Sequence, residues 1–124
     1  FESVNNKEDL SKISYLKDDK ILVTSKQVIN LYKNNFKNLI IFDVPFQTIP
    51  WNKYKINSGQ FVYDKKKIIR NFHDYLNQKN IKNIIIDTSD AENEIINNSL
   101  LGEFLKTKTI TFKYTNFTLH KINF

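Results

Sequence analysis

Apolar and polar residues follow one another along the chain in blocks that predict helices and buried strands in turn. Short continuous apolar runs are typical of strands buried on both faces, and they occupy residues 20–24, 38–44 and 81–87. Apolar residues at helical spacing predict helices over residues 6–17, 24–33, 64–79 and 89–105. The segment 108–122 instead alternates about Thr115 and Asn116, which predicts an antiparallel hairpin.

Residues that favour helix ends support several of these boundaries. Thr24 and Gln27 have the spacing of a capping box, and so do Ser89 and Glu92. Helices also start well at Asn6 and at Asp64, because both side chains can accept a hydrogen bond from the first turn. Two residues are candidates for helix ends: Asn80, which tolerates positive φ, and Gly102.

The order α-β-α-β-loop-α-β-α-β-β predicts a three-layer α/β sandwich with a mostly parallel central sheet and an antiparallel C-terminal hairpin. No linker or repeat interrupts the 124 residues, so we expect one α/β domain over 1–124. The order is Rossmann-like, but the chain has only Gly59 and Gly102, and neither lies between a strand and its helix. We therefore expect no dinucleotide loop and no cofactor.

Ligands of open α/β sheets bind at the carboxyl ends of the parallel strands. There the sequence places Asp43, Asp87 and Asp90. Converging carboxylates can hold Mg²⁺ for phosphoryl chemistry, but aspartates after strands also cap the following helix. These three residues are candidates for a ligand site of a self-contained small α/β enzyme or ligand-binding protein, and we assign no catalytic residue and no metal.

A long segment, residues 45–59, contains both prolines of the chain and three aromatic side chains, Phe46, Trp51 and Tyr54. Aromatic residues in such a loop either form a platform for a sugar or a protein partner, or fix the loop to the core. We keep Trp51 and Tyr54 as partner candidates on that basis.

Composition restricts the classes of partner. The net charge is +6, but only one of the 19 basic residues is arginine, which is typical of the codon bias of an AT-rich genome. Because nucleic-acid binders usually use arginine for bidentate contacts to phosphate and guanine, this composition argues against a nucleic-acid partner. Four basic residues open the predicted helix at 64–79 and oppose its dipole: Lys65, Lys66, Lys67 and Arg70. A merely solvated face is the more common explanation of such a cluster, and the alternative is an anion- or lipid-facing patch, for which we keep these four residues as candidates. The chain has no cysteine, and the sequence favours structural or exposed positions over catalytic ones for its two histidines, His73 and His120. No apolar run approaches the roughly 20 residues that span a bilayer.

Three segments resemble one known family. Asp19–Val23 resembles the charged lead-in to its first strand, Tyr75–Asp87 its helix and following strand, and Phe117–Ile122 its closing strand. The family is the C-terminal extracytoplasmic domain of bacterial GT-C-type polytopic membrane glycosyltransferases, the group similar to dolichyl-phosphate-mannose-protein mannosyltransferases. The sequence has Asn80 where the family tends to have glycine, and His120 where it tends to have tyrosine.

The resemblance implies a parent enzyme that transfers a sugar from a polyprenyl-phosphate carrier, with its catalytic acidic residues in the membrane part. This chain, which begins at Phe1 and contains no methionine, is then expected to be a processed or excised piece of that protein. The resemblance further implies a non-catalytic domain outside the cytoplasm, tethered to the membrane through its parent. Its expected partners are the membrane portion of the parent chain, a glycan or protein acceptor, and an anionic membrane surface.

Overall fold

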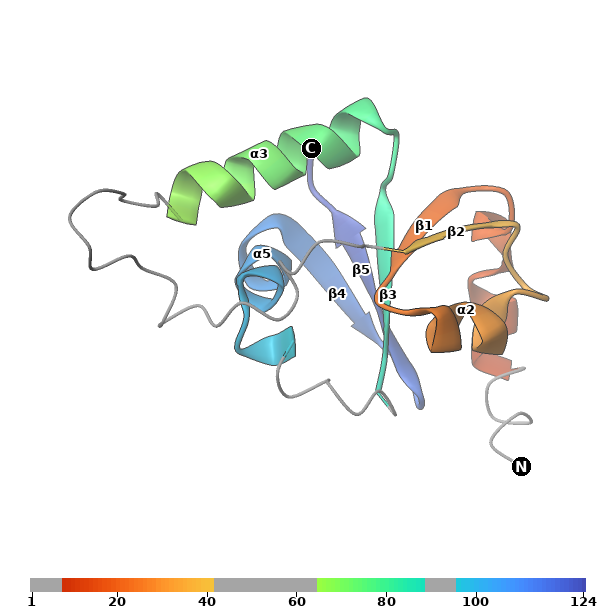
Figure 1. Ribbon diagram of the computed structural model, residues 1–124. Helices are drawn as coiled ribbons and strands as arrows, with labels where there is room; N and C mark the ends of the chain where they lie inside the picture. The colour runs from red at the N-terminus through yellow and green to blue at the C-terminus, as the bar shows by residue number, and fades with distance from the viewer. Residues whose placement is uncertain (1–7, 42–64, 89–95) are drawn as a thin grey trace.

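A five-stranded mixed sheet organises the residues that the computed structural model describes, which are 8–41, 65–88 and 96–124 (Figure 1). The strands are β1 (Lys20–Val23), β2 (Asn38–Ile41), β3 (Asn83–Asp87), β4 (Thr109–Lys113) and β5 (Phe117–Ile122). The helices are α2 (Lys26–Tyr32), α3 (Lys65–Gln78) and α5 (Leu100–Lys108), preceded by helical residues 8–12 and the 3₁₀ turn η1 (Ser14–Leu16). None of the helices among these residues is long and apolar enough to cross a membrane.

The strand order is β2-β1-β3-β5-β4. β1 runs parallel to β2 and to β3, with Leu22 opposite Ile40 on one side and Ile84 on the other. β5 is antiparallel to β3, and β4 is antiparallel to β5. The predicted α/β class, with a parallel centre and an antiparallel C-terminal hairpin, is therefore confirmed.

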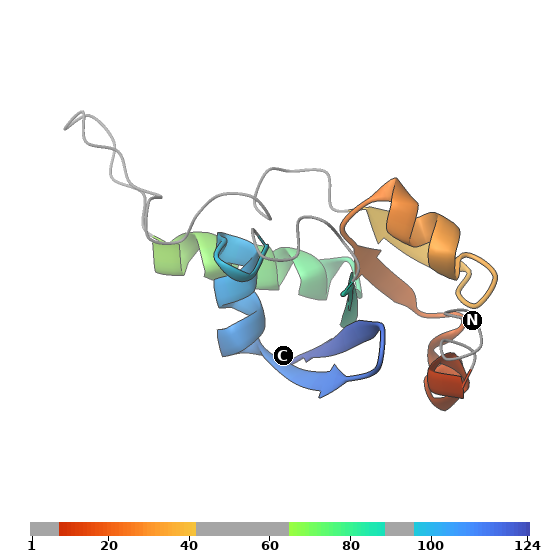
Figure 2. The ribbon, with the colours of Figure 1, turned by 90° about the horizontal axis from the view of Figure 1, so that it is seen from below.

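Both faces of the sheet bury apolar side chains, because successive residues of a strand point to opposite faces. Leu22 of β1 and Ile84 of β3 belong to a cluster with apolar residues of α3 and α5. Ile21 and Ile85, their neighbours in sequence, belong to a second cluster with apolar residues of α2 and of the N-terminal segment 8–16. Figure 2 shows the same division, with α3 and α5 on one side of β3 and α2 on the other.

The first two helices differ in detail from the prediction. Ser25, not Thr24, caps α2: its hydroxyl accepts the Val28 N–H at 3.3 Å, while Thr24 is buried at the end of β1. The helix expected over 6–17 gives way after residue 12 to η1. The reason is local, since the Ser11 hydroxyl bonds the Glu8 carbonyl at 2.6 Å and the Ile13 N–H bonds the Leu10 carbonyl three residues back.

The last predicted helix, expected over 89–105 with Gly102 as a possible end, does not end at Gly102. The Ser99 hydroxyl accepts the Gly102 N–H at 3.2 Å and donates to the Ile96 carbonyl at 2.6 Å, so α5 starts at Leu100 and continues to Lys108. A side chain at position 102 would place its Cβ 2.4 Å from the Asn97 carbonyl oxygen. Glycine is thus required by close backbone contact and not by a helix end. The predicted caps Asn6, Asp64, Ser89 and Glu92 lie outside the described residues.

The predicted end of α3 is confirmed. Asn80 has a φ of 58°, the left-handed conformation, directly after the helix. Its N–H bonds the Asn77 carbonyl at 3.1 Å, and the Ile81 N–H bonds the Leu76 carbonyl at 2.9 Å. These two bonds form a Schellman motif, in which Leu76 and Ile81 are also both buried in the same apolar cluster. The turn directs the chain into β3.

Candidate functional site

The carboxyl end of β3 carries Asp87, one of the three aspartates expected at a ligand site. Its side chain points to the face covered by α2, and the residue is 2% exposed. Tyr32 lies in the last turn of α2, and helical side chains lean toward the helix N-terminus, which here is the direction of the carboxyl edge. The Tyr32 hydroxyl donates a hydrogen bond to Asp87 Oδ2 at 2.5 Å.

Aromatic rings enclose this pair. The Phe117 ring meets the Tyr32 ring edge-on, with centroids 5.8 Å apart, and Tyr114 stacks on Phe117 at 4.8 Å. Burial, followed by the hydrogen bond and the charge of Asp87, raises the pKa of the Tyr32 phenol above its usual range. The phenol is therefore a permanent donor at neutral pH. A metal ion or substrate would have to displace it to reach Asp87 Oδ2.

The structure describes only one of the three aspartates expected at the ligand site, Asp87. Asp43 and Asp90 lie outside the described residues, and so do Trp51, Tyr54 and the whole segment 42–64. Within the described ranges no three potential metal-ligating side chains group together. The aspartate site thus stays a prediction, with Asp87 placed in the core and bonded to Tyr32.

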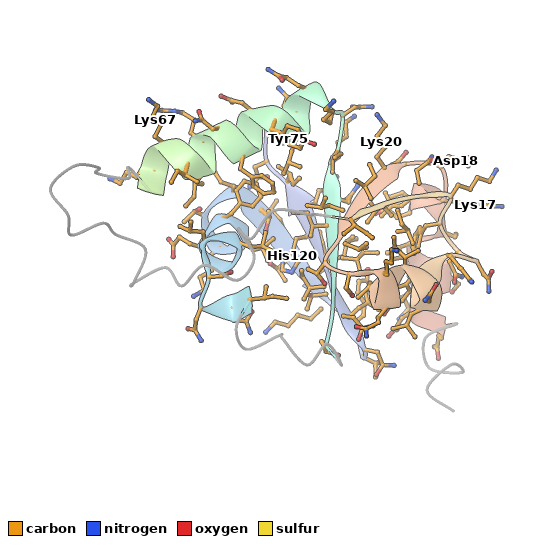
Figure 3. All side chains as sticks on the ribbon, viewed as in Figure 1. Lys17, Asp18, Lys20, Lys67, Tyr75 and His120 are labelled. Carbon is orange, nitrogen blue, oxygen red and sulfur yellow. The ribbon has the colours of Figure 1, made fainter. Side chains whose placement is uncertain are left out.

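The basic residues of α3 occupy one exposed face. Lys66, Lys67 and Arg70 are exposed, whereas Ile69 and Phe72 on the opposite face are buried. Figure 3 shows Lys67 directed away from the sheet at the start of the helix. Lys65 is the first residue of α3, and the first turn contains no acidic residue. The positive end of the helix dipole and the side chains of Lys66, Lys67 and Arg70 therefore form one electropositive surface.

Both histidines have structural contacts. His120 is 7% exposed, and its two ring nitrogens each lie 2.9 Å from a threonine hydroxyl, that of Thr111 on β4 and that of Thr118 on β5. Burial lowers the pKa of His120 to about 4, so the ring is neutral near pH 7. His73 of α3 is hydrogen-bonded to the Asn123 carbonyl and packs against Phe124, with ring centroids 4.9 Å apart, which fixes the chain end to α3.

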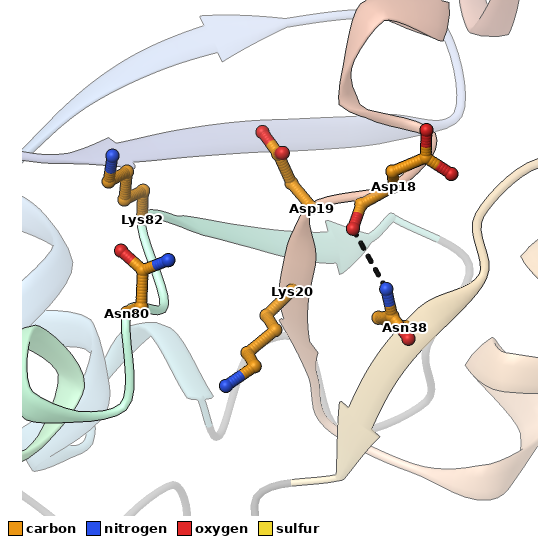
Figure 4. A pocket seen from close by; sticks show the side chains of 6 residues that line it. All are labelled: Asp18, Asp19, Lys20, Asn38, Asn80 and Lys82. Atoms are coloured by element: carbon orange, nitrogen blue, oxygen red, sulfur yellow. Dashed lines mark hydrogen bonds between the residues drawn. The ribbon is translucent and has the colours of Figure 1, made fainter.

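A polar cavity of about 230 Å³ lies at the opposite, amino edge of the parallel strands (Figure 4). It is lined by six polar or charged residues: Asp18, Asp19, Lys20, Asn38, Asn80 and Lys82. The Asn38 amide donates to the Asp18 carbonyl at 2.8 Å, and the Lys20 ammonium donates to the Lys79 carbonyl at 3.0 Å. The lining offers charges of both signs but no hydroxyl, thiol or imidazole side chain, and the volume is below the roughly 300 Å³ of ordinary ligand pockets.

Sequence reasoning missed this cavity because the rule for open sheets directs attention to the carboxyl edge. The available signal was the charged run before β1 together with Asn80 and Lys82 before β3. Comparison with protein-family models, with curated proteins and with solved structures finds no match for this chain.

Proposed function

We propose that this chain is a non-catalytic accessory domain of a membrane-bound glycosyltransferase or a related envelope protein, acting outside the cytoplasm in acceptor or partner recognition at the membrane surface. The observation that carries the proposal is the exposed basic face of α3, formed by Lys66, Lys67 and Arg70. In this proposal that face rests on anionic lipid headgroups and orients the domain on the bilayer.

The magnitudes fit a tethered domain. Each basic side chain near an anionic surface contributes roughly 1 kcal/mol, so three contribute about 3 kcal/mol at low salt. That gives a free domain only weak binding to a membrane, which is measurable at low salt and high lipid concentration. It is enough to bias the orientation of a domain that its parent chain already keeps close to the bilayer, because tethering makes the local lipid concentration high.

The fold is compatible with the resemblance on which this proposal draws. The helix-to-strand segment Tyr75–Asp87 has its left-handed residue at Asn80, where the family tends to have glycine, and Phe117–Ile122 is the closing strand. We further propose that the arrangement is the three-layer α/β sandwich expected from the sequence. The two apolar clusters on opposite faces of the sheet support this part of the proposal.

The first experiment determines the size and location of the native gene product, with an antibody raised against this chain and separated membrane and soluble fractions. We expect a membrane-fraction band several times larger than 14.8 kDa. A soluble band near that mass would contradict the proposal, as would hydrolase or transferase activity of the isolated chain.

A second experiment tests the α3 face by co-sedimentation with phosphatidylglycerol vesicles and with phosphatidylcholine vesicles at low salt. The test variant replaces Lys66, Lys67 and Arg70 with glutamine. Its matched control replaces three exposed lysines elsewhere: Lys17, Lys26 and Lys33. Both variants lower the formal net charge from +6 to +3. We expect binding to anionic vesicles to be lost in the test variant and largely kept in the control, and equal losses would contradict a role for α3.

A further inference from the structure

β4 forms one edge of the sheet, and among the residues that the structure describes no strand pairs with its outer side. The Tyr114 N–H bonds the Phe117 carbonyl at 2.9 Å, and the Asn123 N–H bonds the Lys108 carbonyl at 2.8 Å. In an antiparallel ladder, bonded positions alternate, so residues 110 and 112 also bond β5. The backbone N–H and C=O groups of Thr109, Thr111 and Lys113 therefore point away from the sheet.

The side chains of this edge are apolar on one face. Ile110 is 51% exposed and Phe112 is 44% exposed, and they are two residues apart, which places them on the same face of the strand. Most edge strands in proteins are protected by charges, by proline or by a covering segment. The only charged residue of β4 is Lys113, at its end, and no strand of the described part of the chain pairs with its outer side, so its centre offers a template for strand addition.

The charges around this edge have one sign. After Glu103 the chain contains no acidic residue, while four lysines lie on or beside the hairpin: Lys106, Lys108, Lys113 and Lys121. An occupant with carboxylates at both ends of a short apolar strand would complement this distribution. A second copy of the chain would not, because antiparallel pairing of two β4 strands about Thr111 brings a second set of lysines to the same edge and supplies no carboxylate.

We propose that β4 binds an extended acidic segment of a partner protein, which adds to the sheet as a sixth strand. Its backbone pairs with Thr109, Thr111 and Lys113, its apolar side chains cover Ile110 and Phe112, and its carboxylates lie near the flanking lysines. The outward backbone groups favour a peptide over a lipid surface, because headgroups do not present donors and acceptors at the spacing of a strand. This inference goes beyond the membrane proposal and does not depend on it.

The test uses a fluorescent peptide with a core of alternating valine and threonine and two glutamates at each end, compared with the same peptide carrying lysines in place of the glutamates. Anisotropy gives the affinity, and amide hydrogen exchange locates the peptide. We expect at least tenfold tighter binding of the acidic peptide and slowed exchange at Thr109, Thr111 and Lys113. No binding, equal binding of the two peptides, or protection elsewhere would overturn the proposal.

Two variants at one position separate edge pairing from general effects. Thr111→Pro removes the outward N–H, and Thr111→Ala keeps it, while both lose the hydroxyl contact with His120. Proline is tolerated on an edge strand where its missing N–H faces outward. We expect Thr111→Pro to weaken binding at least tenfold relative to Thr111→Ala, and equal affinities would overturn strand addition.

A third variant keeps the test valid if Thr111→Pro does not fold. Lys113→Glu combined with Lys121→Glu reverses two exposed charges, and we expect it to prefer the lysine peptide. An unchanged preference for the acidic peptide would overturn the charge argument. Sedimentation velocity tests a second copy of the chain as the occupant, and a dimer that the variants abolish would overturn the proposal. Vesicle binding tests a membrane as the occupant. Vesicle binding that the variants lose, without any peptide binding, would also overturn the proposal.

Discussion

Tyr32 and Asp87 are 55 residues apart in the sequence, and their side chains form a buried hydrogen bond of 2.5 Å inside an otherwise apolar cluster. The bond joins the last turn of α2 to the carboxyl end of β3. An isolated carboxylate is costly to bury, and the phenol is one donor that offsets the cost of placing Asp87 in the core. The pair fixes where α2 sits along the strands.

Tyr32→Phe tests this bond. The substitution keeps the ring and its packing on Phe117 but leaves Asp87 with one donor fewer, and an unsatisfied buried polar group costs about 1–3 kcal/mol. We therefore expect the free energy of unfolding in urea to fall by about that amount. Asp87→Asn is the control, because its amide oxygen still accepts from the phenol while the buried charge is removed. A smaller loss is expected for Asp87→Asn, and an unchanged stability of Tyr32→Phe would contradict the role of the pair.

The strands and α3 could be predicted from sequence because their signals are local. The apolar runs at 20–24 and 81–87 locate β1 and β3 to within two residues, and the 3.6-residue spacing of Ile69, Phe72 and Leu76 locates α3. Asn80 was also predictable, because few residues tolerate positive φ. In each case the residue type itself carries the information.

The site could not be predicted in the same way, because its contacts are long-range. Nothing in the sequence near Asp87 indicates that Tyr32 satisfies it, so a buried bonded carboxylate and an open ligand site have the same sequence pattern. Gly102 was mistaken for a helix end because a glycine required by close backbone approach looks like one required for a turn. The edge position of β4 likewise depends on strand order, which the hairpin pattern alone does not set.

Asn80 provides a test of backbone conformation. Residues other than glycine and asparagine are penalised in the left-handed region by roughly 1–2 kcal/mol. We expect Asn80→Ala to lower the free energy of unfolding by about 1 kcal/mol and Asn80→Gly to change it by less than about 0.5 kcal/mol, because glycine adopts φ of 58° without strain. Chemical denaturation of the two variants measures the difference. Equal stabilities would show that the Schellman turn does not constrain this position.

Gly102→Ala tests the close contact at the start of α5. Alanine is the better helix former by about 1 kcal/mol, so helix propensity alone predicts a gain in stability. The contact predicts a loss, because the new Cβ would lie 2.4 Å from the Asn97 carbonyl oxygen and 2.5 Å from that of Ile96, both backbone atoms. We expect a loss of about 1–3 kcal/mol, typical of overpacking. Lys106→Ala, an exposed position on the same helix, is the control and should be nearly neutral.

His120 makes the fold sensitive to mild acid. Burial lowers the pKa of His120 from 6.5 to about 4, so between these values the unfolded chain binds a proton that the folded chain does not. We therefore expect the free energy of unfolding to fall as the pH drops from 6.5 toward 4, by up to about 3 kcal/mol in total. Well outside that range the contribution of His120 does not change with pH. The bond from the Thr115 N–H lowers the pKa of Asp9, whose contribution is lost mainly as the pH falls below 3.8, so most of the loss lies below the His120 window.

Thermal unfolding at a series of pH values measures this dependence. His120→Gln keeps a donor and an acceptor for the hydroxyls of Thr111 and Thr118 but does not titrate, so its melting temperature should change less between pH 6.5 and 4 than that of the unmodified chain. His73→Gln leaves His120 in place and should keep the His120 part of the slope. If the slope is the same in His120→Gln as in the unmodified chain, the buried imidazole is not its source, and protonation elsewhere must destabilise the fold.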